Sequence, residues 1–151
     1  MKKLITFLTT LTLLFNLSIV SNAAAAVNAD TSSKSVEVVD LGNGMTIEYE
    51  ITELPSIARA STKTAAKTAT CKLDGVKIAT VKLTATFSYT GSSATCTSAS
   101  ATYTTYDGWN ATNKSTTRSG NTATTSAYVY KGIKHTTLTT TMKCSATGVI
   151  S

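Results

Sequence analysis

The chain is poor in the residues that build catalytic centres and metal sites. His135 is its only histidine, so a multi-histidine metal site and an HExxH helix are both excluded. The chain also lacks the GxSxG, GxxxxGK[ST] and GxGxxG patterns of nucleophile elbows and phosphate-binding loops. We therefore expect no catalytic residue, no metal ion and no cofactor.

Carboxylates are scarce in the second part of the chain. Residues 61–151 contain only Asp74 and Asp107, and each precedes a glycine in a two-residue turn signal. A glycosidase needs two carboxylates that face each other across a cleft, and turn aspartates do not supply them. A catalytic triad or a cysteine nucleophile would depend on placing Asp107 or Cys71 beside His135. The sequence therefore predicts a protein that is not an enzyme.

Long apolar runs are confined to the N-terminus. Lys2 and Lys3 precede an apolar run over residues 4–20, and small residues follow up to Ala26. This order is typical of a secretory signal peptide over residues 1–26. The alternative is a membrane anchor, but six polar residues interrupt the run, which is shorter than the roughly 20 apolar residues that a span prefers. We expect a secreted, extracellular protein with no membrane span after cleavage.

Charge divides the rest of the chain into two parts. Residues 27–60 carry six acids and two bases, and residues 61–151 carry ten bases and two acids, for net charges of about −4 and +8. Pro55, the only proline, marks the break between an acidic hairpin and a basic domain. A basic exported domain is expected to meet an anionic surface such as a cell-wall polymer, or its own acidic segment. The alternative is that scattered lysines only keep the protein soluble.

Threonine and serine crowd the basic domain and alternate with apolar residues, which favours folded strands over a disordered stalk. One strand, over residues 76–89, changes phase, because Val76 and Ile78 have the opposite parity to the apolar residues from Val81 to Tyr89. A β-bulge at Ala79-Thr80 would bring both sets to one face. Closely spaced strands predict an all-β fold, an antiparallel β-sandwich of the immunoglobulin-like kind over 61–151, preceded by the acidic hairpin. A small open barrel is the alternative.

Three cysteines follow the apolar run, and an exported compartment permits a disulfide. Cys144 lies on the inward parity of the last strand, and Cys96 begins an earlier strand, so they are the candidate pair. Cys71 would then be the free thiol. The alternative is three reduced, buried thiols.

Two further groups are candidate binding residues. Tyr103, Tyr106 and Trp109 cluster around a turn and are candidates for stacking on a ligand, although core packing between the sheets is favoured for Trp109. Tyr128 and Tyr130 share one strand face. Lys77 and Lys82 are expected on a basic, water-facing surface.

Three segments, Thr86–Thr97, Lys114–Ala123 and Lys143–Gly148, resemble small uncharacterised secreted proteins of Gram-positive, clostridial-type bacteria with a Thr/Ser-rich β domain. The resemblance implies export and supports a Cys96–Cys144 pairing. It implies no activity.

These observations predict a non-enzymatic protein that binds an anionic surface polymer or a protein partner, with no nucleic acid expected. The alternative is a bacteriocin or toxin whose acidic segment masks the basic domain until cleavage near Arg59.

Overall fold

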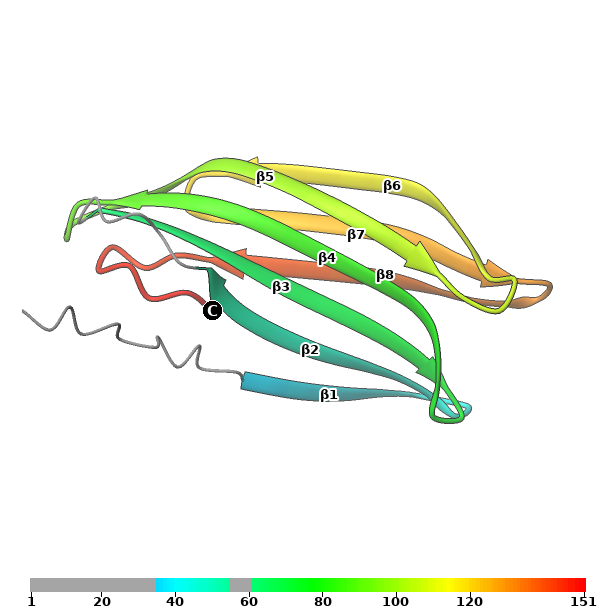
Figure 1. Ribbon diagram of the computed structural model, residues 1–151. Helices are drawn as coiled ribbons and strands as arrows, with labels where there is room; N and C mark the ends of the chain where they lie inside the picture. Colours follow the sequence, from blue (N-terminus) through cyan, green and yellow to red (C-terminus); the bar gives the residue numbers. More distant parts are fainter. Residues whose placement is uncertain (1–34, 55–60) are drawn as a thin grey trace, which may run out of the picture.

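A computed structural model describes residues 35–54 and 61–151, which form eight antiparallel strands (Figure 1). The strands are β1 Ser35–Gly42, β2 Met45–Leu54, β3 Thr62–Leu73, β4 Val76–Tyr89, β5 Ala94–Thr105, β6 Asn110–Ser119, β7 Thr122–Lys131 and β8 Lys134–Lys143. Strands β1 to β5 form one sheet and β6 to β8 a second sheet, each in chain order. The expected all-β antiparallel sandwich is confirmed. Each sheet is a meander, whereas immunoglobulin sandwiches have Greek-key connections.

The acidic hairpin is part of the larger sheet. β1 pairs with β2, and β2 pairs with β3 without interruption from Met45 opposite Leu73 to Leu54 opposite Thr64. The expectation that the hairpin lies against the basic domain is therefore confirmed for its described residues. The predicted signal peptide over 1–26 and the cleavage point at Arg59 lie outside the described residues.

The predicted bulge in β4 is present, one residue earlier than expected. Cys71 pairs with Ala79 and Lys72 pairs with Lys77, so Ile78 is the extra residue. The apolar residues that follow are buried at alternate positions from Val81 to Phe87. Val76, in contrast, is 56% exposed, because it is the first residue of β4, beside the Asp74-Gly75 turn. The prediction that Val76 shares the buried face is wrong.

The core between the sheets has two parts. One part, which we call the turn-end core, lies toward the β3–β4 turn and contains Trp109 and Leu138 among others. The other part, which we call the tail-end core, lies toward the C-terminal residues and contains Phe87, Met142 and Cys144. β8 packs against β3 and β4, while β7 packs against β4 and β5. The predicted inward parity of β8 is confirmed by burial of alternate residues from Leu138 to Cys144.

Four of the connections lie at one end of the sandwich, which we call the turn end (Figure 1). They join β1 to β2, β3 to β4, β5 to β6 and β7 to β8. Asp74 and Asp107 have φ angles of 51°, as expected for turns in which both central residues take positive φ. The C-terminal residues 144–151 lie at the opposite end. Among the described residues, no helix has the length and apolarity needed to cross a bilayer.

Candidate ligand-binding surfaces

The described cysteines form no disulfide, so the predicted Cys96–Cys144 bridge is wrong. The two residues belong to the same core, but each thiol is directed at a nearby backbone carbonyl. Cys96 Sγ donates to the carbonyl oxygen of Ser98 at 3.2 Å, and Cys144 Sγ donates to that of Ser145 at 3.4 Å. The alternative of three buried thiols is what the structure shows.

Cys71 is free, as expected, and fully buried in the turn-end core. Burial raises the pKa of its thiol to about 11. Burial is also the main reason why the pKa values of Cys96 and Cys144 are raised. A reactive cysteine needs a lowered pKa and access to solvent, so these sites favour structural thiols.

The aromatic cluster at the β5–β6 turn does not form a stacking surface. Trp109 is only 6% exposed and packs in the turn-end core, which confirms the alternative of core packing. The Tyr103 hydroxyl is bound within the protein, 2.7 Å from Thr125 Oγ1. Tyr106 is exposed, with Lys77 Nζ 5.7 Å from the centre of its ring. The three aromatic side chains therefore do not form one ligand-binding surface.

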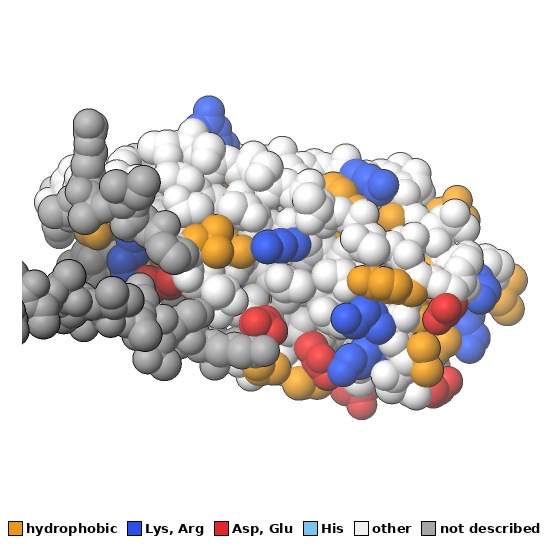
Figure 2. Space-filling view, in the orientation of Figure 1, with side chains coloured by type: hydrophobic (Ala, Val, Ile, Leu, Met, Phe, Trp, Pro, Cys, Tyr) orange, Lys and Arg blue, Asp and Glu red, His pale blue; other side chains and the backbone are white. Residues whose placement is uncertain are grey.

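The basic residues Lys77 and Lys82 are both exposed on β4, as expected. In the larger sheet, however, the lysines share the surface with acids. Figure 2 shows acidic side chains in the lower part of the view and at its right-hand end, whereas the visible upper surface carries lysines without acids. Lys72 Nζ lies 2.6 Å from Glu48 Oε1, and Lys63 Nζ lies 3.2 Å from Glu53 Oε2. These two β3 lysines pair with acids of β2.

The smaller sheet has no acid at all, because residues 108–151 contain neither aspartate nor glutamate. Its outer face instead carries three rings that lie together. The rings of Tyr128 and Tyr130 are 5.9 Å apart between centroids, and His135 stacks on Tyr128 at 5.4 Å with an interplanar angle of 29°. Tyr130 and His135 are paired neighbours on β7 and β8. Both tyrosines are half-buried and His135 is exposed.

Hydroxyl side chains continue this surface along the three strands. By strand register, the outward positions beside the rings are Thr112, Ser115, Thr117, Thr124, Ser126, Thr137, Thr139 and Thr141. The Thr124 and Thr141 hydroxyls are 3.2 Å apart. We call these residues and the three rings the aromatic–hydroxyl face. Alternation had placed Tyr128 and Tyr130 on one face, but His135 joins them only through the register that the Gly132 turn imposes.

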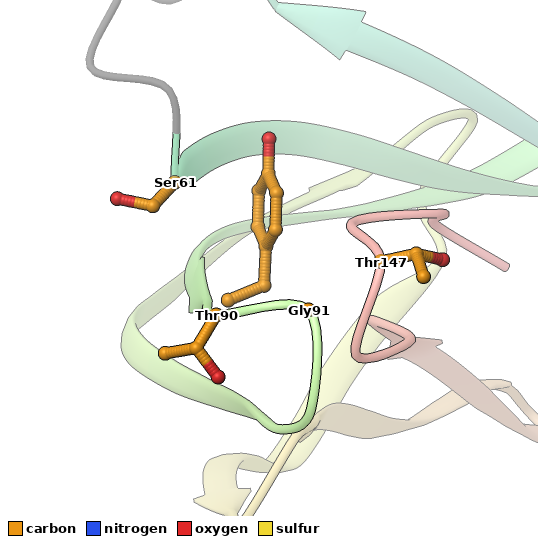
Figure 3. A pocket seen from close by; sticks show the side chains of 5 residues that line it. Ser61, Thr90, Gly91 and Thr147 are labelled. Atoms are coloured by element: carbon orange, nitrogen blue, oxygen red, sulfur yellow. The ribbon is translucent and has the colours of Figure 1, made fainter.

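A pocket of about 370 Å³ lies at the end opposite the four turns (Figure 3). It is lined by Ser61, Tyr89, Thr90, Gly91 and Thr147, and it carries hydroxyl groups and one aromatic ring without a charge. Ser61 adjoins residues 55–60, which lie outside the described residues, so we assign no ligand to this pocket. The described residues also contain no cluster of three His, Cys, Asp or Glu side chains that could hold a metal ion.

Comparisons with protein-family models, curated proteins and solved structures found no match for the chain. The resemblance to small secreted clostridial-type proteins stays a prediction. Support for a function comes from the geometry and charge of the aromatic–hydroxyl face.

Proposed function

We propose that the protein is an exported, non-enzymatic binding protein whose ligand is an anionic surface polysaccharide. The observation that carries the proposal is the group of neighbouring rings formed by Tyr128, Tyr130 and His135 on a sheet face without carboxylates. The aromatic–hydroxyl face is the binding surface.

The chemistry of this face suits a sugar polymer. An aromatic ring offers an apolar face to the C–H groups of a sugar ring, while the tyrosine hydroxyl stays available for a hydrogen bond. Each threonine or serine hydroxyl can donate one hydrogen bond and accept others, as the hydroxyl groups of a sugar require. Lys143, which is exposed at the end of β8 and lies opposite Thr122 on the outward parity of this face, would attract phosphate or carboxylate groups of the polymer.

A pull-down on purified Gram-positive cell wall tests the proposal. We expect Tyr128→Thr and Tyr130→Thr each to weaken binding by about tenfold, which corresponds to about 1.4 kcal/mol. Threonine keeps a high strand propensity, so both variants should fold. Tyr106→Thr is the matched control, since Tyr106 lies away from this face. Equal losses in all three variants would contradict the proposal.

The anionic part of the ligand needs a separate test. Binding should weaken as salt is added, because exposed charges are screened over about 8 Å at physiological ionic strength. It should also weaken when the wall is stripped of its phosphate-containing polymers, and in the variant Lys143→Gln. Binding that is indifferent to all three changes would show that the ligand is a neutral polymer.

The toxin alternative receives no support from the hairpin. A removable mask should leave a complete domain behind, whereas Met45 and Ile47 of β2 are buried in the turn-end core. Removing the hairpin would open that core instead of uncovering a finished surface.

A further inference from the structure

Exposed apolar side chains gather at the turn end. Ile133 is 95% exposed at the tip of the β7–β8 turn, and Leu41, Val76 and Tyr106 are exposed in or beside the other three turns. The remaining large exposed apolar residues of the described chain lie elsewhere, at Val36 and Val38 on β1 and Val149 in the tail. A contiguous exposed apolar patch is typical of a contact site for another protein or a membrane, so the question is whether apolar surface joins these tips.

The apolar surface continues inward from these tips. A cavity of about 450 Å³ is lined by Leu73, Trp109, Lys131, Gly132, Ile133 and Lys134. A second cavity, of about 230 Å³, is lined by Asn43, Met45, Leu73, Ile133, Lys134 and His135. Both share Leu73, Ile133 and Lys134, so the β7–β8 turn stands between two hollows with apolar floors. Their rims carry lysine side chains.

Charge at this end is uneven. The β7–β8 turn holds Ile133 between Lys131 and Lys134, and the smaller sheet adds no acid. Lys131 Nζ lies 2.5 Å from the backbone carbonyl oxygen of Asp107. The acids of the turn end, Asp40, Asp74 and Asp107, belong to the other three turns. The side that the smaller sheet presents is therefore basic as well as apolar.

We propose that the turn end docks on a lipid bilayer containing anionic phospholipid, with Ile133 inserted below the headgroups. The four turns lie at one end of the sandwich, and the β7–β8 turn, which carries no acid, is the one that enters the bilayer (Figure 1). Lysines beside an inserted apolar residue keep their ammonium groups among the phosphates while their alkyl stems lie on apolar surface. The charge of the β7–β8 turn complements anionic headgroups.

Vesicle flotation of the full chain tests this docking. The wild type should float with vesicles of phosphatidylcholine and phosphatidylglycerol, and more weakly with phosphatidylcholine alone. Ile133→Ser should lower the partition coefficient about tenfold or more, given the transfer free energy of an isoleucine side chain. Lys134→Gln should weaken binding to the anionic vesicles. Both positions are exposed, so the variants should fold.

Matched controls lie at the other end of the molecule. Val149→Ser and Lys143→Gln remove an exposed apolar residue and an exposed lysine there, and should leave flotation unchanged. Absence of wild-type flotation, or equal losses at Ile133 and Val149, would overturn the proposal. Self-association that Ile133→Ser abolishes, without flotation, would show instead that a second copy covers this end.

Bilayer docking and polysaccharide binding depend on different side chains, so one substitution can remove either activity without the other. Tyr128→Thr should lower wall binding and leave flotation intact, whereas Ile133→Ser should do the reverse. Brominated lipids provide a second readout, because Trp109 lines the larger cavity and is the only tryptophan. Quenching of its fluorescence is expected on docking, and unchanged fluorescence would contradict contact at this end.

Discussion

Thr125 and Thr140 face each other across β7 and β8, and both are fully buried between the sheets. The Thr125 hydroxyl lies in a network, donating to the carbonyl oxygen of Ser115 at 2.8 Å and meeting the hydroxyls of Tyr103 and Thr116. The Thr140 hydroxyl has no hydrogen-bond partner among the described residues. Two chemically identical side chains therefore contribute to stability with opposite signs.

Replacing each of the two threonines by valine should show this difference. Thr140→Val removes a buried hydroxyl that forms no hydrogen bond and should stabilise the fold by about 1 kcal/mol. Thr125→Val removes the hydrogen bonds of the Thr125 hydroxyl to Tyr103, Thr116 and the Ser115 carbonyl. It should cost about 1 kcal/mol, because the Tyr103 hydroxyl keeps Thr116 Oγ1 at 3.0 Å and the Ser115 carbonyl oxygen at 3.2 Å. Urea denaturation of the two variants measures both changes. Changes of the same sign would contradict the assigned network.

Cys71 predicts a loss of stability at alkaline pH. Its pKa rises from 9.0 to about 11 on folding because the thiol is buried. Below pH 9 both states keep the proton. Above it the unfolded chain ionises first, so stability falls until about pH 11, by about 3 kcal/mol in total. Cys71→Ala should lose less stability over this range than the wild type, and parallel denaturation profiles would refute the assignment.

At the scale of strands, alternation predicted most of the sandwich. β4 and β8 were identifiable because their large apolar residues recur at every second position. The start of β3 carries no clear strand pattern, because the segment from Thr62 to Lys67 has only alanine as apolar residues. Ala65 and Ala66 are nevertheless buried, since strands β2 and β4 flank β3.

Contacts between strands explain the failures at the candidate sites. A cysteine pair needs the distance and direction of two side chains, and strand parity gives neither. Parity likewise shows which rings share a strand face, so Tyr128 and Tyr130 were found together. It does not show that Trp109 is buried or that His135 stacks on Tyr128, because both depend on register and on the second sheet.

The β1–β2 hairpin should behave as an integral part of the fold. A chain that begins at residue 61 loses two buried side chains, Met45 and Ile47, together with the ladder to β3. We expect it to lose several kcal/mol, a large part of the roughly 5–15 kcal/mol that stabilises a typical domain. Thermal unfolding followed by circular dichroism measures the loss, and a cooperative transition near that of the full chain would contradict it.

Changing the salt concentration distinguishes the two forces that hold this hairpin, which are ion pairing and the burial of apolar side chains. The pairs Lys72–Glu48 and Lys63–Glu53 are partly exposed and contribute little each, whereas burial of Ile47 is not screened. After protease cleavage at Arg59, the hairpin should stay bound at low and at high salt. Release at high salt would show that charges hold it.

At the scale of the whole molecule, the two core regions should unfold together, because β4, β7 and β8 contribute to both. Phe87 lies in the tail-end core and the reporter Trp109 in the turn-end core. Phe87→Ala should cost about 3–5 kcal/mol. The midpoints from Trp109 fluorescence and circular dichroism should then fall equally. A fluorescence midpoint that stays at the wild-type value would show that the two regions unfold separately.

The meander order of the strands has a mechanical consequence. Eight antiparallel strands in chain order bring Ser35 and residues 144–151 to the same end of the sandwich. Tension applied between these ends pulls β1 away from β2, starting at the pair Ser35 and Ile51. The hydrogen bonds between the two strands then break one pair after another. The force would act on all of these hydrogen bonds at once only if the two points of attachment lay at opposite ends of the sandwich. The protein should therefore yield at low force when it is stretched by its ends, however well it resists heat.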